Sequence, residues 1–145
     1  MLSKILLATD FGQGSDGAVA HCLALAEKFN ASVVIHHAIE TLELDEDEDE
    51  TLAAFYESLR LSAEQKLHVM VDQFRARGVT ATALVTLGRR WSEIVGAADR
   101  EAAELIILGS QEPAASPPGL VGTTSHKVFL TAHVPILVAR PLLRR

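Results

Sequence analysis

The sequence predicts an α/β protein with a doubly wound, five-stranded parallel sheet in the order 3-2-1-4-5 and helices on both faces. Short apolar runs alternate with helical repeats along the 145 residues, which provides the long crossovers that parallel strands require. The first, second and fourth runs are apolar without alternation, as in strands covered on both faces. The third run alternates and therefore fits a sheet edge.

Length and composition fit one soluble domain over residues 1–145, and a hydrophobic content of 48% supports a substantial core. The net charge of −6 comes from the acidic run 45–50, since the other 13 acidic residues (19 − 6) balance 13 basic ones. No basic footprint for nucleic acid remains. The single cysteine excludes an internal disulfide. No apolar stretch fits a signal peptide or a membrane span, so we expect a cytoplasmic protein without nucleic-acid or membrane partners.

The first strand is expected over 4–9, followed by Asp10, with Ser15 as the cap of the next helix. One stripe of that helix should be buried, and it comprises Ala18, Cys22, Leu25 and Phe29. Cys22 is then a small core residue rather than a nucleophile. Residues 12–17 match G-x-G-x-x-G, but nearby carboxylates would repel a pyrophosphate and two residues separate the strand from the first glycine. A turn is favoured over a dinucleotide site.

The second strand is expected over 32–39. His36 and His37 near its end point to opposite faces, so they cannot chelate one ion, and no metal site is expected. The acidic run 45–50 is interpreted as a solvated loop, with a calcium site as the weaker alternative because no EF-hand pattern is present. A long helix over 51–77 should cover the sheet with one stripe, which comprises Phe55, Leu59, Ala63, Leu67, Met70 and Phe74.

The third strand is expected over 79–87, and the next helix should begin near Ser92. Trp91 should pack at the helix start, and the inward positions are Ile94, Val95, Ala98 and Ala102. Arg89 and Arg90 could reach an anion, but solvated surface positions are favoured for both.

Residues 105–139 carry the most informative pattern. A buried strand ending at Gly109 is followed by a loop, by the helix start Val121-Gly122-Thr123-Thr124-Ser125, and by a strand over 134–139. Unpaired N–H groups and the partial positive charge at a helix start suit a phosphate, and Gly122 would allow its close approach. On this stretch alone the favoured interpretation is simpler: Thr123 or Thr124 caps the helix.

In the order 3-2-1-4-5 the winding reverses between the first and fourth strands, where such sheets bind ligands. Asp10 and Gly109 should face each other there across a crevice. The fifth strand is left at an edge, although its residues Ile136, Leu137, Val138 and Ala139 are all apolar. We expect a homodimer through this strand, favoured over a fold-back of 141–143, because prolines confine the pairing to a short self-complementary segment.

Several separated motifs resemble one known family. They are Ile5-Leu6-Leu7-Ala8-Thr9-Asp10 with Ser15, the pair His37-Ala38, Glu104-Leu105-Ile106-Ile107-Leu108-Gly109-Ser110, and Pro135-Ile136-Leu137-Val138. Together they make the chain similar, over residues 4–140, to the universal stress proteins. The resemblance implies their adenine nucleotide α-hydrolase-like fold.

The nucleotide-binding branch of that family carries G-x-x-G, nine residues, then G-[S/T]. Gly109 and Gly122-Thr123 match this spacing, whereas Glu112 stands at the second glycine and Pro113 follows it. The resemblance implies that Asp10 holds the nucleoside and that the backbone of Ala38 meets adenine. The residues implied to cradle ribose and phosphates are Gly109, Gly122, Thr123 and Thr124. A carboxylate at position 112 would oppose phosphates by something on the order of a few kcal/mol.

The resemblance implies a dimeric stress-response protein that binds an adenine nucleotide, ATP or AMP, with Mg²⁺ accompanying the nucleotide. The alternative is a nucleotide-independent universal stress protein that acts as a protein-interaction adaptor, a reading motivated by Glu112 and Pro113. An enzyme is not expected, and no catalytic residue is assigned. The chain lacks G-x-x-x-x-G-K-[S/T], and Lys127 lies a turn inside its helix, so ATP hydrolysis would be slow at most.

Overall fold

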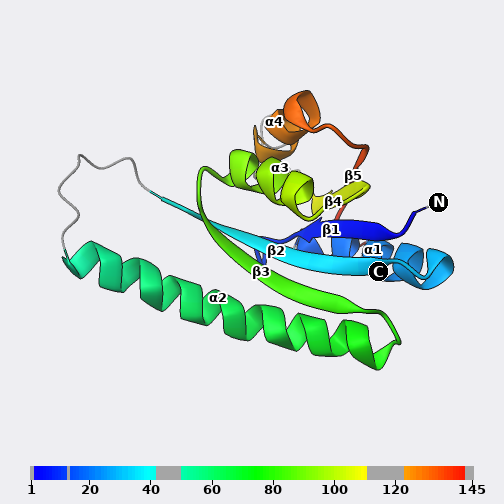
Figure 1. The fold of residues 1–145 in the computed structure, drawn as a ribbon, viewed down its shortest axis with the longest axis horizontal. Coiled ribbons are helices and arrows are strands. Elements are labelled where there is room, and N and C mark those ends of the chain that lie inside the picture. Colours follow the sequence, from blue (N-terminus) through cyan, green and yellow to red (C-terminus); the bar gives the residue numbers. More distant parts are fainter. Residues whose placement is uncertain (1, 13, 42–49, 111–122, 143–145) are drawn as a thin grey trace.

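The computed structural model describes residues 2–12, 14–41, 50–110 and 123–142 (Figure 1). In these ranges strands and helices alternate, and their bounds are β1 Lys4–Ala8, α1 Ser15–Phe29, β2 Ser32–Glu40, α2 Glu50–Ala76, β3 Ala81–Gly88, α3 Arg90–Arg100, β4 Leu105–Gly109, α4 Thr123–Thr131 and β5 Ile136–Ala139. All strand pairs are parallel and the order is β3-β2-β1-β4-β5. The predicted fold class and strand order are confirmed.

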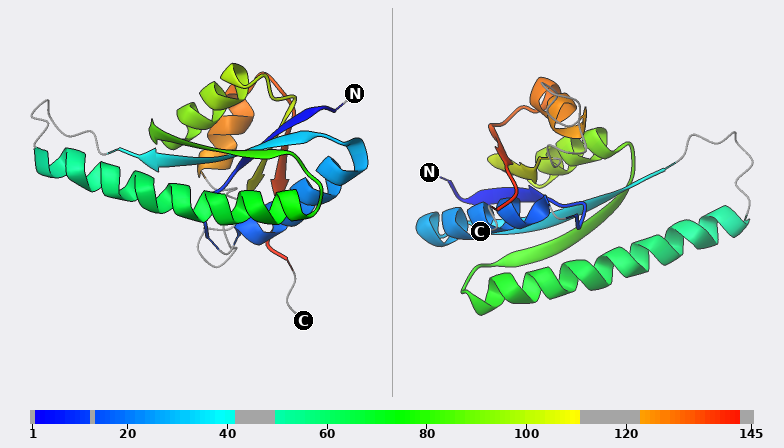
Figure 2. Two further views of the ribbon diagram at one scale, coloured as in Figure 1. Left: turned by 60° about the horizontal axis from the view of Figure 1, so that its bottom comes forward. Right: turned by 180° about the vertical axis from the view of Figure 1, so that it is seen from behind.

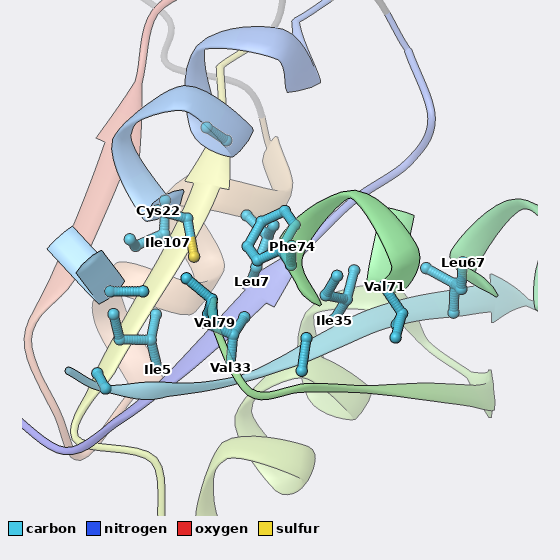
Figure 3. Close-up of a cluster of buried hydrophobic side chains, with 14 of the residues drawn as sticks. Ile5, Leu7, Cys22, Val33, Ile35, Leu67, Val71, Phe74, Val79 and Ile107 are labelled. Carbon is cyan, nitrogen blue, oxygen red and sulfur yellow. The ribbon is translucent and has the colours of Figure 1, made fainter. Parts of the chain in front are cut away.

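Each face of the sheet packs against two helices, because successive side chains of a strand point to opposite sides. Ile5 and Leu7 of β1 face α1 and α2, in a cluster that also buries Phe74 (Figure 3). Leu6 and Ala8 face α3 and α4 on the other side. The two views in Figure 2 show the same layering, with α1 and α2 on one side of the sheet and α3 and α4 on the other.

Two predictions for α1 are wrong. Ser15 is the first helical residue rather than the cap, because the cap position belongs to Gly14 and no side-chain cap bond forms there. Phe29 is 44% exposed, and Ala26 is buried instead. The buried stripe advances by four residues at each step, from Ala18 through Cys22 to Ala26, so it turns away from Phe29 before the helix ends.

The stripe of α2 is buried only in the second half of the helix. Ala63, Leu67 and Phe74 are buried, whereas Phe55 is 53% exposed and Leu59 37%. Figure 1 shows that the beginning of α2 extends past the ends of the strands, so this part of the helix has no strand beside it. The prediction that the whole stripe is covered is therefore wrong for its first two members.

The helix α3 begins at Arg90, two residues before the predicted start. Trp91 packs, as expected, against the core cluster between the sheet and the helices α3 and α4. Ala102 is exposed, which contradicts its predicted inward position. The helix has ended by then, and the left-handed backbone of Ala102, with φ of 55°, turns the chain so that Ala103 is buried instead.

The strands β3 and β5 form the two edges of the sheet, as predicted. Main-chain bonds from Ile106 to Pro135 and from Ser110 to Ala139 join β4 to β5. The main-chain groups of alternate residues in a strand point to the same neighbour, and the carbonyls of Pro135 and Ala139 face β4. The N–H and C=O groups of Ile136 and Val138 therefore point to the open edge of the sheet.

The chain after β5 does not return along that strand in the part that the structure describes. The main chain of Arg140 packs against Gly17 of α1, and the N–H of Leu142 donates to the carboxylate of Asp16 at 3.2 Å. Residue 143 of the segment that the alternative to a dimer would fold back over β5 lies outside the described residues. Within the same ranges, no helix combines the length and the apolar character needed to span a membrane.

Candidate functional site at the carboxyl ends of the strands

The carboxyl ends of β1, β2 and β4 lie side by side. Ala8 of β1 pairs with His36 of β2 on one side and with Leu108 of β4 on the other. Asp10, Ala38 and Gly109 therefore occupy the same edge of the sheet, although they are far apart in sequence. The first and fourth strands are neighbours, as the predicted crevice requires.

Asp10 closes the turn between β1 and α1. Its Oδ1 accepts the N–H of Gly12 at 2.8 Å and the hydroxyl of Ser15 at 2.9 Å. The Ser15 hydroxyl oxygen in turn accepts a hydrogen bond from the buried hydroxyl of Thr9 at 3.2 Å. Ser15 thus fixes the carboxylate of Asp10 rather than the first turn of the helix.

Gly109 lies in direct contact with the start of α1. A Cβ atom added at Gly109 would lie under 3.0 Å from the carbonyl oxygen of Gly14, and one added at Gly14 would be equally close to the carbonyl oxygen of Ser110. The N–H of Ser110 already donates to Ala139 at 2.8 Å. Glycine at these positions lets backbone pack on backbone, whatever else Gly109 does.

Close contact between main-chain segments also explains two glycines of the G-x-G-x-x-G match, Gly14 and Gly17. A Cβ atom at Gly17 would also lie under 3.0 Å from a carbonyl oxygen, that of Arg140. Among the described glycines, only Gly78 and Gly88 have positive φ. Gly12 and Gly14 lie in the turn before α1 as predicted, whereas residues 15–17 form the first turn of that helix, so the turn predicted over 12–17 is wrong there. Gly14 and Gly17 serve close packing rather than an unusual backbone angle.

The main chain of Ala38 stands where the ladder between β1 and β2 stops. The N–H of Ser32 donates to the carbonyl of Ser3, and the carbonyl of His36 accepts from the N–H of Thr9 at 2.9 Å. Every second residue of β2 therefore turns its main-chain N–H and C=O toward β1, and Ala38 is one of these residues. Continuation of the ladder would join Ala38 to the carbonyl of Thr9 and to the N–H of Phe11.

Both of those groups are bonded elsewhere. The carbonyl of Thr9 accepts from His37 Nδ1 at 2.8 Å, and the N–H of Phe11 donates to the Thr9 hydroxyl at 3.0 Å. Ala38 is only 4% exposed. Among the described residues, its N–H and C=O on that side have no ladder partner, which is uncommon for buried backbone.

Three side chains that the sequence did not single out for the site stack beside it. The ring of Phe11 lies 4.4 Å from that of His37, centroid to centroid, and Lys66 Nζ lies 5.1 Å from the centroid of Phe11. The neighbouring strand ends were the available signal, because Phe11 and His37 both follow the Ala8–His36 pair. The position of Lys66 on α2 carries no such signal.

The two adjacent histidines differ in environment. His36 is fully buried with Nε2 2.8 Å from the Thr86 hydroxyl, and burial lowers its pKa to about 4, with the charges of His37 and Arg100 adding to the effect. Burial also lowers the pKa of His37, partly offset by its bond to the Thr9 carbonyl. Within the described ranges, no three His, Cys, Asp or Glu side chains are grouped so as to hold a metal ion.

The predicted phosphate cradle is only partly in view. Gly122, Glu112 and Pro113 lie outside the described residues, as does the acidic run 45–50. Thr123 begins α4, and Thr124 is half-buried in its first turn. Which residue caps α4 therefore stays a prediction.

A doubly wound parallel sheet with helices on both faces places the chain in the class of α/β domains whose ligand sites, where they have them, lie at the edge where the winding reverses. Within this class the chain belongs to the universal stress protein family, whose model matches residues 1–140. A universal stress protein of Thermus aquaticus is 30% identical over 141 residues, covering 97% of this chain and 100% of the relative.

Solved structures agree with this assignment. That of MJ0577 from Methanocaldococcus jannaschii has a TM-score of 0.83 at 25% identity, covering 96% of each chain. A universal stress protein in complex with cAMP (20% identity, 97% and 98% covered, TM-score 0.67) and one from Archaeoglobus fulgidus in complex with dAMP (18%, 97% and 98%, 0.64) share the fold.

Proposed function

We propose that residues 1–145 form one universal stress protein domain that acts as a homodimer and binds an adenine nucleotide, ATP or AMP, between β1 and β4. Two relatives of the same fold hold adenine nucleotides, cAMP and dAMP, in their solved structures. The residues we assign to the site are Asp10, Ala38, Gly109, Gly122, Thr123 and Thr124.

The main chain of Ala38 is the observation that carries the proposal. A buried N–H and C=O left without ladder partners at a ligand-binding edge favour a planar group with its own donor and acceptor. An adenine ring has both. Asp10 lies on the neighbouring strand end, and both of its bonds use Oδ1, so Oδ2 is the oxygen we assign to a ribose hydroxyl.

Direct detection of the nucleotide tests the proposal. The purified protein is denatured and the supernatant analysed by mass spectrometry, and refolded or nucleotide-free protein is titrated with ATP and AMP, with and without Mg²⁺. We expect a bound adenine nucleotide and a thermal shift. The substitution Asp10→Asn should weaken binding, whereas Asp72→Asn, an exposed position on α2, should not. Absence of both bound nucleotide and thermal shift would reject the proposal.

A second candidate function rests on the glycine loop. Glu112 and Pro113 replace the family pattern, and proline removes a donor N–H, which favours an adaptor that recognises a protein partner without nucleotide. Micromolar affinity of the wild-type protein for ATP would count against it. If the nucleotide binds, Glu112→Gly should tighten ATP binding, and an unchanged dissociation constant would mean that the carboxylate lies away from the phosphates.

We assign no catalytic role to the site. The sequence carries no G-x-x-x-x-G-K-[S/T] loop and Lys127 lies a turn inside α4, so any ATP hydrolysis should be slow. A turnover above about one per second, the low end for enzymes, would contradict this.

A further inference from the structure

Phe11 has a backbone conformation that its residue type does not favour. Three non-glycine residues of the described chain have positive φ: Phe11 at 64°, Asn30 at 53° and Ala102 at 55°. Asn30 caps α1, and Ala102 follows the end of α3, both usual places for a left-handed residue. Phe11 instead lies between a strand and a helix. A bulky residue keeps this conformation only when its surroundings impose it.

Contacts from β2, from α2 and from Thr9, the residue that follows β1, impose it. The ring of His37 from β2 covers one side of Phe11 at 4.4 Å with an interplanar angle of 31°, and the ammonium group of Lys66 from α2 lies 5.1 Å from the ring centre. The N–H of Phe11 is held by the Thr9 hydroxyl. His37 is itself fixed, because its Nδ1 must donate to the Thr9 carbonyl, an acceptor only.

This conformation decides what Ala38 can bind. If Phe11 were extended, its N–H could reach Ala38 and prolong the ladder between β1 and β2 by one step. The left-handed turn directs the chain away instead, toward the loop in which Asp10 accepts from Gly12 and Ser15. The same residue thus keeps the main chain of Ala38 open and sets the position of the Asp10 carboxylate.

We propose that Phe11 is the positioning residue of the nucleotide site, held in its left-handed conformation by the stack of His37, Phe11 and Lys66. The inference rests on the proposed function and deepens it. Phe11 acts through Asp10 and Ala38, and it need not touch the ligand.

Four variants separate the backbone effect from the ring. Phe11→Ala removes the ring and leaves a residue that disfavours positive φ. Phe11→Gly removes the ring but allows positive φ freely. Phe11→Tyr keeps an aromatic ring, and Lys66→Met keeps an apolar stem of similar length while removing the charge over the ring.

The affinity for AMP or ATP should follow the backbone. We expect Phe11→Ala to weaken binding about tenfold or more, since the stack that imposes the left-handed backbone is lost and alanine does not favour that conformation. Phe11→Gly should bind more tightly than Phe11→Ala. Phe11→Tyr should stay within about twofold of the wild type, and Lys66→Met should weaken binding about two- to fivefold, as expected for an exposed cation–π contact. Thermal unfolding of each variant shows whether it is folded.

A second readout needs no nucleotide. The histidine resonances of the wild type and of Phe11→Ala are titrated by NMR, and loss of the covering ring should raise the pKa of His37 toward its ordinary value. Two results would overturn this inference alone, provided that the wild type binds nucleotide. One is that folded Phe11→Ala binds as tightly as the wild type, and the other is that Phe11→Ala and Phe11→Gly bind equally. Failure of the wild type to bind either nucleotide would overturn the proposed function and this inference together.

Discussion

The buried imidazole of His36 should make the protein sensitive to mild acid. His36 is 0% exposed and the one hydrogen bond of its ring is to the Thr86 hydroxyl, while His37 and Arg100 add positive charge nearby. Its pKa is lowered from 6.5 to about 4 in the folded protein. The unfolded chain therefore binds a proton between these values and the folded chain does not, so stability is full above pH 6.5 and falls as the pH drops toward 4.

The size of the effect follows from the shift. The full difference of 2.5 pKa units (6.5 − 4) corresponds to about 3 kcal/mol. Only part of it is lost at moderate pH. At pH 5 the unfolded imidazole is almost wholly protonated and the folded one almost wholly neutral, which removes about 2 kcal/mol relative to pH 7.5. That is a large share of the stability of an ordinary domain.

Urea unfolding at pH 7.5 and at pH 5.0 measures this difference. The comparison is with His36→Gln, which keeps a polar partner for Thr86 but cannot be protonated. The variant should start less stable and lose about 2 kcal/mol less than the wild type between the two pH values. Equal losses in the two proteins would show that His36 is not held neutral by burial, and the argument would fail.

Four further outcomes follow from the packing and burial of individual residues. Gly17→Ala should destabilise the protein by about 1–3 kcal/mol in urea unfolding, because the new Cβ would strike the carbonyl of Arg140. Gly96→Ala, which meets only the flexible end of Arg100, should be neutral or stabilising by up to about 1 kcal/mol. Cys22 is 0% exposed and burial raises its pKa to about 12, so iodoacetamide should label it at pH 8 only in denaturant, and rapid labelling of the native protein would contradict this. Val138→Pro removes an N–H group of the open edge of β5 and leaves the hydrogen bonds between β4 and β5 in place. If β5 forms the dimer interface, light scattering should find a monomer. An unchanged dimer would mean that the interface lies elsewhere.

The strand order of the sheet was predictable because central and edge strands differ in their pattern of apolar residues. β1 and β4 are apolar on both faces, and the apolar and threonine positions of β3 alternate. Periodicity does not record where a neighbouring element ends. Phe55 and Leu59 continue the stripe of Leu67 and Phe74 without interruption, yet they are exposed.

The arrangement of the candidate site was predictable where topology alone places a residue. Asp10 follows β1, Ala38 lies near the end of β2 and Gly109 ends β4, so strand order brings them to one edge of the sheet. The role of Ser15 was not predictable, since a hydroxyl at a helix start normally bonds its own helix, whereas here Asp10 competes for it. Nor was the backbone of Phe11, because phenylalanine has no preference for positive φ and the contacts that impose it come from β2 and α2.

The meeting of Gly109 with Gly14, and of Gly17 with Arg140, joins α1 to β4 and β5 without any compressible side chain between them. We expect α1, β4 and β5 to move as one rigid body, because main-chain atoms in close contact have no alternative rotamer that could accommodate a displacement. If the proposed nucleotide binds at this edge, any adjustment should come from the short turn after β1 and not from a hinge between helix and sheet. Hydrogen exchange should reveal this division, with the amides that follow Gly17 in α1 as slow as those of the central strands.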